Sequence, residues 1–101
     1  MLITISLAKP EWVTKPQDTT SVSHSSVVLP CMAFGLPVVQ YKWYFNGKPV
    51  KETERYHFSN GNLTIKGLTH SDNGMYQCFV GNKHGELHAD VELTVSGNIT
   101  Y

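Results

Sequence analysis

Apolar and polar residues alternate with a period of two along most of this chain, the pattern of β-strands that bury one face. Five segments carry this alternation, and the apolar residues of each segment share one face. The five sets are Val27, Leu29, Cys31 and Ala33; Val39, Tyr41, Trp43 and Phe45; Leu63 and Ile65; Tyr76, Cys78 and Val80; and Ala89, Val91, Leu93 and Val95. No window has the pattern of a capped amphipathic helix, so we predict an all-β protein.

Turn-forming residues separate these segments. They are Gly35 to Pro37, Asn46-Gly47, Asn60-Gly61, Asp72-Asn73-Gly74 and Lys83-His84-Gly85. Asn-Gly between β-type segments is a strong hairpin signal, because both central residues of a type I′ turn need a positive φ. Short strands at regular spacing predict an all-β sandwich. Pro30 lies inside one strand and removes a ladder donor, so we expect its nitrogen to face a break or an edge in the neighbouring strand.

Length and charge narrow the class of protein further. The chain has 101 residues, which suits one domain and is too short for two. Eight basic and eight acidic side chains cancel, so the overall charge offers no attraction to nucleic acid, an anionic membrane or an acidic substrate. No apolar run approaches the ~18 residues of a membrane-spanning helix. Any membrane attachment is therefore expected only through the rest of a parent protein.

Two cysteines, Cys31 and Cys78, are the only thiols, and no CxxC spacing points to a tetrahedral metal site. They can be two buried thiols or one disulfide. A disulfide across this separation would stabilise the fold by about 4 kcal/mol in the chain-entropy model. That is a large share of a typical unfolding free energy of ~5–15 kcal/mol.

The order and spacing of these residues resemble the immunoglobulin fold. Trp43 follows Cys31 by 12 positions, and Asp72-Asn73-Gly74-Met75-Tyr76-Gln77-Cys78 resembles the D-x-G-x-Y-x-C signature of such domains. The resemblance implies two antiparallel sheets joined by a B–F disulfide between Cys31 and Cys78, and a tyrosine corner at Tyr76. It also implies an ion pair between Arg55 and Asp72. The implied core signature comprises Trp43, Leu63, Asp72, Gly74 and Tyr76.

The short stretch between Trp43 and Leu63 leaves no room for a full C′–C″ hairpin and resembles the intermediate (I-set) type. The segments Ser71 to Cys78, Asn82 to Gly85 and Ala89 to Val95 are similar to neural adhesion molecules of the contactin, L1 and Dscam kind. That likeness implies a non-catalytic module for cell adhesion or axon guidance, one of several tandem domains. It would bind neighbouring immunoglobulin domains and a homophilic or heterophilic protein partner. The alternative is a structural I-set domain of an intracellular filament or cytoskeletal scaffold with reduced cysteines.

We expect the domain to occupy residues 9–96, with a C-terminal tail or linker at 97–101. Residues 1–8 are apolar but lack a basic flank and a cleavage-type small pair, so we do not expect a signal peptide. Ile3, Ile5 and Leu7 alternate like the end of a strand. This segment is therefore expected to be the tail of a preceding domain, an early strand or a cloning remnant.

Two N-x-S/T sequons occur, at Asn62 and Asn98, and glycosylation requires exposure in a secretory compartment. We expect the Asn62 side chain to point outward, because Leu63 belongs to the core. Together with the cysteine pair, two sequons favour an extracellular, cell-surface location.

No residue pattern indicates catalysis, a cofactor or a metal site. His84 and His88 are four residues apart, a spacing that converges on a helix but not across a β-turn. The chain has no Gly-x-Ser-x-Gly elbow and no phosphate-cradling glycine loop. We therefore expect neither an enzyme nor a small-molecule substrate.

A protein-binding surface is expected on an outward face that is unusually apolar. If Trp43 and Cys78 face inward, the residues facing outward on the C–F–G sheet include Lys42, Tyr44, Met75, Gln77, Phe79, His88, Asp90 and Glu92. Aromatic residues are enriched in interface cores, so the candidate partner-binding residues are Lys42, Tyr44, Phe79 and His88. On the opposite sheet, Val28, Met32 and Phe34 would face outward and form a second candidate patch. Leu36, Pro37, Lys83 and His84 are expected at one tip, which in a tandem array would contact the next domain or a ligand.

Overall fold

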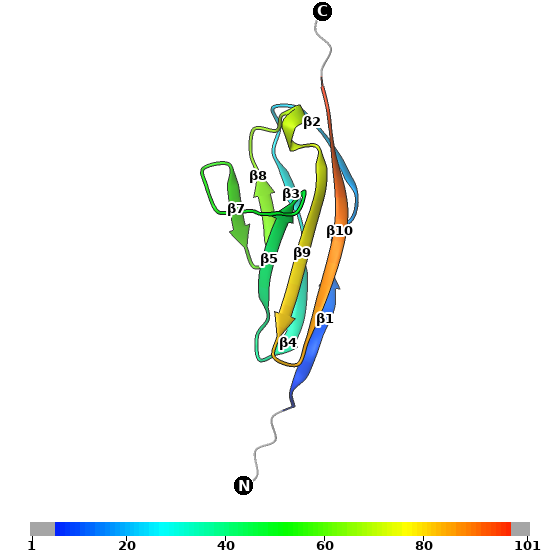
Figure 1. The fold of residues 1–101 in the computed structure, drawn as a ribbon, viewed down its shortest axis with the longest axis vertical. Helices are drawn as coiled ribbons and strands as arrows, with labels where there is room; N and C mark the ends of the chain where they lie inside the picture. Colours follow the sequence, from blue (N-terminus) through cyan, green and yellow to red (C-terminus); the bar gives the residue numbers. More distant parts are fainter. Residues whose placement is uncertain (1–5, 98–101) are drawn as a thin grey trace, which may run out of the picture.

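Short strands account for nearly all of the regular structure in the computed structural model, which describes residues 6–97 (Figure 1). In chain order the elements are β1 (Ala8–Thr14), β2 (Thr19–Val22), β3 (Val27–Leu29), β4 (Met32–Leu36), β5 (Gln40–Phe45), β6 (Lys48–Pro49), β7 (Tyr56–Ser59), β8 (Asn62–Ile65), the 3-10 turn η1 (His70–Asp72), β9 (Gly74–Asn82) and β10 (Gly85–Ser96). No helix among the described residues is long and apolar enough to cross a membrane.

The strands form two facing layers. One layer is a five-stranded sheet in the order β2-β10-β9-β5-β6, in which β2 pairs parallel with β10 and the other pairs are antiparallel. The other layer combines the sheet β3-β8-β7 with the pair β1-β4. In the strand lettering of immunoglobulin domains, β5, β9 and β10 are strands C, F and G, while β3 and β4 are the two halves of strand B. This arrangement confirms the predicted immunoglobulin-like sandwich.

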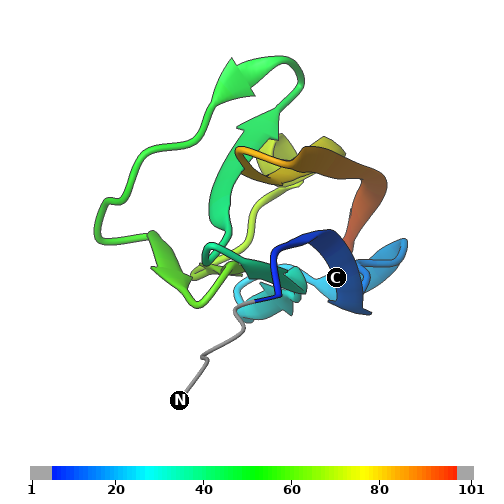
Figure 2. The same ribbon diagram turned by 90° about the horizontal axis from the view of Figure 1, so that it is seen from below.

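The segment between β6 and β7 carries the chain from the first layer to the second. Viewed along the long axis, it runs around one edge of the sandwich in a wide arc (Figure 2). Strand β6 has only two residues, so the sequence here forms no further hairpin before β7. This connection is the I-set feature expected from the short stretch after Trp43.

Strand B itself is interrupted at Pro30, whereas we expected the break or edge in the neighbouring strand. β3 ends at Leu29 and pairs with β8, whereas β4 begins at Met32 and pairs with β1. The backbone N–H of Cys31 lies in this gap and donates to Oδ1 of Asn62 at 3.0 Å. A side-chain amide therefore replaces the ladder bond that is missing at the break.

Two Asn-Gly pairs form the tight hairpin turns that the sequence predicts. Asn46 and Gly47, with φ of 48° and 82°, join β5 to β6, and Asn60 and Gly61, with φ of 49° and 90°, join β7 to β8. Positive φ at both central positions is the type I′ geometry, which matches the right-handed twist of the paired strands. At Gly61 an added Cβ would collide with the backbone oxygen of Cys31, so this turn also packs against the strand break.

The inward-facing residues of both layers form one core around the disulfide. Cys31 and Cys78 are bonded and fully buried, and their separation of 47 residues makes the chain-entropy stabilisation about 4 kcal/mol. Trp43 is 2% exposed, and its indole N–H donates to the carbonyl oxygen of Gly61 at 2.7 Å. The remaining fully buried side chains include Leu29, Leu63, Ile65, Leu68, Tyr76, Val80 and Leu93. The predicted disulfide is thus confirmed.

The beginning of β1 and the end of β10 lie at opposite poles of the sandwich (Figure 1). The turn between β9 and β10 and the loop between β4 and β5 lie at the pole where β1 begins. The expectations for Ile3, Ile5 and Asn98 concern residues outside the described range of 6–97.

Candidate protein-binding surface

A buried carboxylate organises the base of the sandwich. Asp72 is 2% exposed at the end of η1, and its Oδ2 accepts hydrogen bonds from Arg55 Nη2 at 2.6 Å and from the Thr69 backbone N–H at 2.8 Å. The hydrogen bond to Asp72 is also the main cause that raises the pKa of Arg55. The pair predicted between Arg55 and Asp72 is present here as an ion pair, and it ties the segment before β7 to the segment before β9.

Tyr76 is hydrogen-bonded to the backbone of the same residue, Asp72. Its hydroxyl donates to the backbone carbonyl of Asp72 at 2.9 Å, the bond expected of a tyrosine corner. The Phe45 ring stacks on the Tyr76 ring with centroids 4.4 Å apart. Burial raises the pKa of the Tyr76 hydroxyl far above its ordinary value, and burial is also the first cause of the raised pKa of Tyr56. These interactions stabilise the base of the sandwich.

Gly74, the glycine of the predicted signature, lies where a side chain would not fit. Its φ is +152°, and a Cβ would lie 2.6 Å from Oδ1 of Asn46 and 2.7 Å from the Phe45 ring. That same Oδ1 of Asn46 accepts a hydrogen bond from the Met75 N–H at 3.0 Å. Gly74 therefore lets the β5–β6 hairpin dock on the beginning of β9.

The outward residues of β5, β9 and β10 bring the four candidate binding residues together. Lys42, Phe79 and His88 lie directly opposite one another in the ladder, and Tyr44 is one position diagonal to Phe79. The Tyr44 and Phe79 rings meet edge to face at 5.4 Å, and His88 stacks on Phe79 at 5.4 Å. Lys42, Tyr44, Phe79 and His88 are called the C–F–G face below. It is a preformed, partly exposed ring cluster on a five-stranded sheet.

Two open depressions flank Phe79. One, of about 450 Å³, is lined by Pro37, Val38, Gln40, Lys42, Phe79, Gly81, Asn82, Lys83 and Glu86. The other, of about 400 Å³, is lined by Lys42, Tyr44, Gly47, Gln77, Phe79 and Glu86. Lys42, Phe79 and Glu86 border both. The sequence reasoning missed Glu86, although the alternation that places His88 outward places Glu86 outward too.

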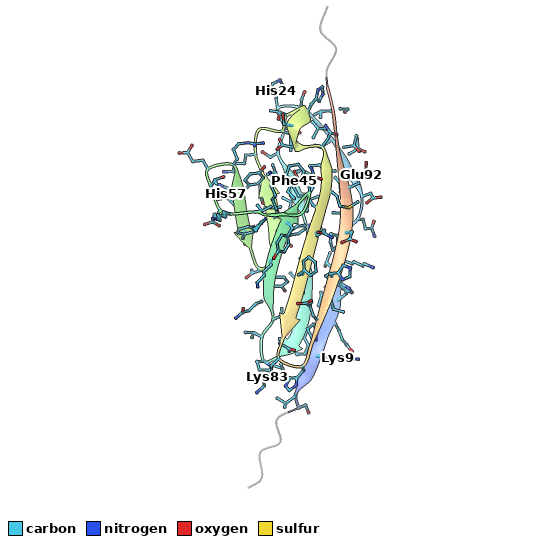
Figure 3. The ribbon with its side chains drawn as sticks, in the orientation of Figure 1. Lys9, His24, Phe45, His57, Lys83 and Glu92 are labelled. Atoms are coloured by element: carbon cyan, nitrogen blue, oxygen red, sulfur yellow. A yellow bond between two sulfur atoms is a disulfide. The ribbon has the colours of Figure 1, made fainter. Side chains whose placement is uncertain are left out.

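The β10 edge of this face is acidic. Glu86, Asp90 and Glu92 alternate with inward residues and are all exposed, as Figure 3 shows for Glu92. Asp90 also accepts a hydrogen bond from the side chain of Gln77 at 3.0 Å, which holds its carboxylate over β9. The ring cluster is therefore bordered by Lys42 on the β5 side and by carboxylates on the β10 side.

Asn82 holds together the pole that carries the predicted tip residues. Its Nδ2 donates to the carbonyl oxygens of Ala8 at 2.8 Å and Pro37 at 3.0 Å. This bond pair joins β1, the loop after β4 and the end of β9 into one surface. Lys83 and Lys9 lie at this pole (Figure 3), and Val38 there is 80% exposed.

The second candidate patch lies on the outer side of strand B. Val28, Met32 and Phe34 are 51%, 36% and 55% exposed, and Asn62 lies beside the break between β3 and β4. The Asn62 side chain is half-buried because its Oδ1 is engaged with Cys31, so it is less free than the sequence suggests.

Within residues 6–97 no group of three or more His, Cys, Asp or Glu side chains is placed to hold a metal ion. His84 and His88 lie on the turn and on β10, and His88 is engaged with the Phe79 ring. The arrangement offers ring faces, shallow depressions and charged borders, which are the means of binding a protein surface.

Comparisons with known proteins agree with this architecture. The sequence is 41% identical to rat contactin-3 over 87% of this chain, and it spans only 9% of that protein's length. The fold is similar to tandem immunoglobulin repeats of Dlar, with a TM-score of 0.83, 26% identity, and coverage of 90% of this chain and 50% of that one. It is also similar to titin domain M7, with a TM-score of 0.82, 31% identity, and coverage of 92% and 99%.

The pattern of the immunoglobulin domain family matches residues 9–82, which include Cys31, Trp43 and the Asp72-to-Cys78 signature. That match covers most of the chain, and the sandwich, its disulfide and its tyrosine corner fit the same family. The chain belongs to the immunoglobulin domain family.

Proposed function

We propose that this domain is a non-catalytic protein-recognition module of a cell-surface adhesion or receptor protein. It acts in adhesion or axon guidance by docking a protein partner on the C–F–G face. The observation that carries the proposal is the ring cluster of Phe79, Tyr44 and His88, exposed on the outer side of the sheet that buries Cys78 on its inner side.

Such a cluster suits the centre of a protein interface. Aromatic side chains supply large contact area with few rotatable bonds, and the energetically dominant residues of interfaces are enriched in Tyr, Trp and Arg. Each of the three residues lies on a strand rather than on a loop, so the binding geometry exists before the partner arrives. The polar residues around the rings resemble the polar rim of an interface.

The charge of this face favours a heterophilic partner over a second copy of the domain. Glu86, Asp90 and Glu92 outnumber Lys42 across the three strands. Two copies docked face to face would bring carboxylates together, and like charges in an interface disfavour binding. A partner with a basic rim around an apolar centre fits better, and its association should slow as salt concentration rises.

The positions of the first and last strands support a place within a tandem array. The beginning of β1 and the end of β10 lie at opposite poles, so flanking domains would follow one another along the long axis (Figure 1). The surface held together by Asn82 would then contact the preceding domain. Likeness to contactin-3 and the Cys31–Cys78 disulfide support an extracellular location, because disulfides persist in oxidising compartments.

The test uses the chain secreted from mammalian cells, with free thiols counted, and coupled to fluorescent beads. Bead binding to cultured neurons measures heterophilic contact, and bead clustering measures self-association. Phe79→Asp should reduce neuron binding at least tenfold. Phe34→Asp introduces the same charge on the opposite sheet and should leave binding unchanged.

If both variants bind neurons as well as the unchanged chain, the C–F–G face is not the docking surface. Two free thiols in the folded protein would instead favour the intracellular filament alternative, to which the likeness with titin domain M7 lends support.

A further inference from the structure

The outer side of strand B carries three exposed apolar side chains. Val28, Met32 and Phe34 point outward in alternation from β3 and β4, and together with Asn62 and Thr64 of β8 they are called the strand-B face below. Thr64 lies directly opposite Val28. Leu63, which separates Asn62 from Thr64, and Ile65, which follows Thr64, are fully buried. Apolar side chains that line up in a column on a surface are candidates for contact with another group.

The same face carries a complete glycosylation sequon, Asn62-Leu63-Thr64. Because strand residues alternate, Asn62 and Thr64 both lie on the outer side. The Cys31 N–H engages Oδ1 of Asn62, and Nδ2 makes no hydrogen bond within the described part of the chain. The hydrogen bond thus orients the amide through its oxygen and leaves available the nitrogen that a glycan would use.

We propose that Asn62 carries an N-linked glycan whose first sugars lie along the strand-B face and cover Met32 and Phe34. In its formation, Nδ2 of Asn62 bonds to the anomeric carbon of a lipid-pyrophosphate-linked oligosaccharide. The bond from that carbon to the pyrophosphate breaks, the lipid pyrophosphate leaves, and one Nδ2 proton is lost to solvent. The inference rests on the proposed extracellular location, because this transfer takes place in the secretory pathway.

The length of the column suits the inner sugars of such a glycan. Met32 directly follows Cys31, whose N–H binds Asn62. Phe34 is three residues after Cys31, which is about 10 Å along the strand at the usual rise per residue. A pyranose ring has an apolar C–H face, which loses contact with water when it packs on Met32 or Phe34. A glycan in this position closes one face of the domain to proteins and leaves the C–F–G face open.

The first experiment asks whether the glycan is present. The chain is secreted from mammalian cells with Asn98→Gln in every version, so that only Asn62 can be modified. Thr64→Ser retains the sequon, and Thr64→Ala removes it while Asn62 keeps its hydrogen bond to Cys31. Intact mass before and after enzymatic glycan removal should show one glycan on the Ser version and none on the Ala version.

The second experiment asks where the glycan lies, with two methionines of similar exposure. Met32 is 36% exposed on the strand-B face, and Met75 is 41% exposed on β9 in the other layer. Both forms are treated with hydrogen peroxide, and sulfoxide formation at each residue is followed by peptide mass spectrometry. Met32 should oxidise at least threefold more slowly in the Ser glycoform than in the Ala version, with equal rates at Met75.

Equal Met32 rates in the two versions would show that the glycan projects into solvent, and the inference would be wrong. A secreted Ser version without glycan, but with a closed disulfide and binding that depends on Phe79, would overturn this inference and leave the proposed function intact. Free thiols together with loss of neuron binding would instead overturn the proposed function.

Discussion

The two sides of β9 use aromatic residues for different purposes. On the inner side, Tyr76 is fully buried, its hydroxyl donates to Asp72, and its ring stacks on Phe45. On the outer side, Phe79 keeps part of its ring in solvent and packs against the rings of Tyr44 and His88. A fully enclosed ring with a satisfied polar atom contributes to the free energy of unfolding, whereas a half-exposed ring leaves contact area for another protein. Substitutions on the two sides should therefore separate stability from binding.

The largest effect of a side-chain truncation is expected on the inner side of the neighbouring strand, at Trp43. Trp43→Ala should lower the free energy of unfolding by about 3–5 kcal/mol, because it leaves a cavity and removes the hydrogen bond to Gly61. Urea unfolding followed by circular dichroism measures the change. Tyr44→Ala, one residue along and facing outward, serves as the control, and an equal loss there would contradict the assignment of the two sides.

Asp72→Asn should have the next largest effect. The substitution keeps the size of the side chain but removes the charge that Arg55 faces, which should lower the free energy of unfolding by about 1.5–3 kcal/mol. Differential scanning calorimetry at neutral pH gives the comparison. A melting temperature unchanged by Asp72→Asn would show that the charge contributes nothing to stability.

Tyr76→Phe tests the buried hydroxyl on the inner side of β9. Loss of the hydrogen bond to the Asp72 carbonyl should cost about 1–2 kcal/mol. The raised pKa of Tyr76 also has a consequence at alkaline pH. The unfolded chain releases the tyrosine proton from about pH 10 upward while the folded chain retains it. The contribution of Tyr76 to stability is therefore constant below that pH and falls above it.

The Phe variant should therefore lose less stability between neutral pH and pH 11 than the unchanged chain. Tyr56, whose pKa is also raised, should account for part of the remaining decline. Urea midpoints measured across this pH range provide the data. If the urea midpoints of the two proteins fall equally steeply with rising pH, the Tyr76 hydroxyl does not govern alkaline unfolding.

The smallest effect on stability is expected for Phe79→Asp. Its partly exposed ring makes few inward contacts, so the free energy of unfolding should change by no more than about 1 kcal/mol while binding is lost. Val80→Asp, the next residue along, would bury a charge in the core and should prevent folding. Thermal melts of the two variants provide the contrast, and a Phe79→Asp protein without a cooperative transition would place Phe79 in the core.

Much of the fold was predictable because it depends on local rules. Alternation identified the inward residues of β5, β9 and β10, and the two Asn-Gly pairs identified hairpins whose geometry needs a positive φ. Pro30 indicated an irregularity because proline cannot donate to a ladder, but the interruption lies in strand B itself and not in its neighbour. The cysteine and tryptophan spacing predicted the sandwich and its disulfide through likeness to a family.

Other features depend on strands that are distant in the sequence. The Tyr41 hydroxyl accepts from the Ala33 N–H at 3.1 Å and lies 3.2 Å from the Ala33 carbonyl oxygen, so a side chain replaces a missing strand at the edge of β4. The inclusion of Glu86 in both depressions beside Phe79 likewise needs the pairing of β9 with β10. Neither contact could be predicted from the neighbouring sequence. Many other residues alternate in the same way without making such contacts.

The sequence by itself determined which residues of each strand face inward, where the chain turns and which cysteines can pair, since periodicity and backbone sterics act over a few residues. The tertiary structure alone decided that Tyr44, Phe79 and His88 meet as one ring cluster and that Asn62 lies beside an apolar column. Those relations follow from the registers of paired strands, and a one-residue change in register would exchange the two faces of a strand.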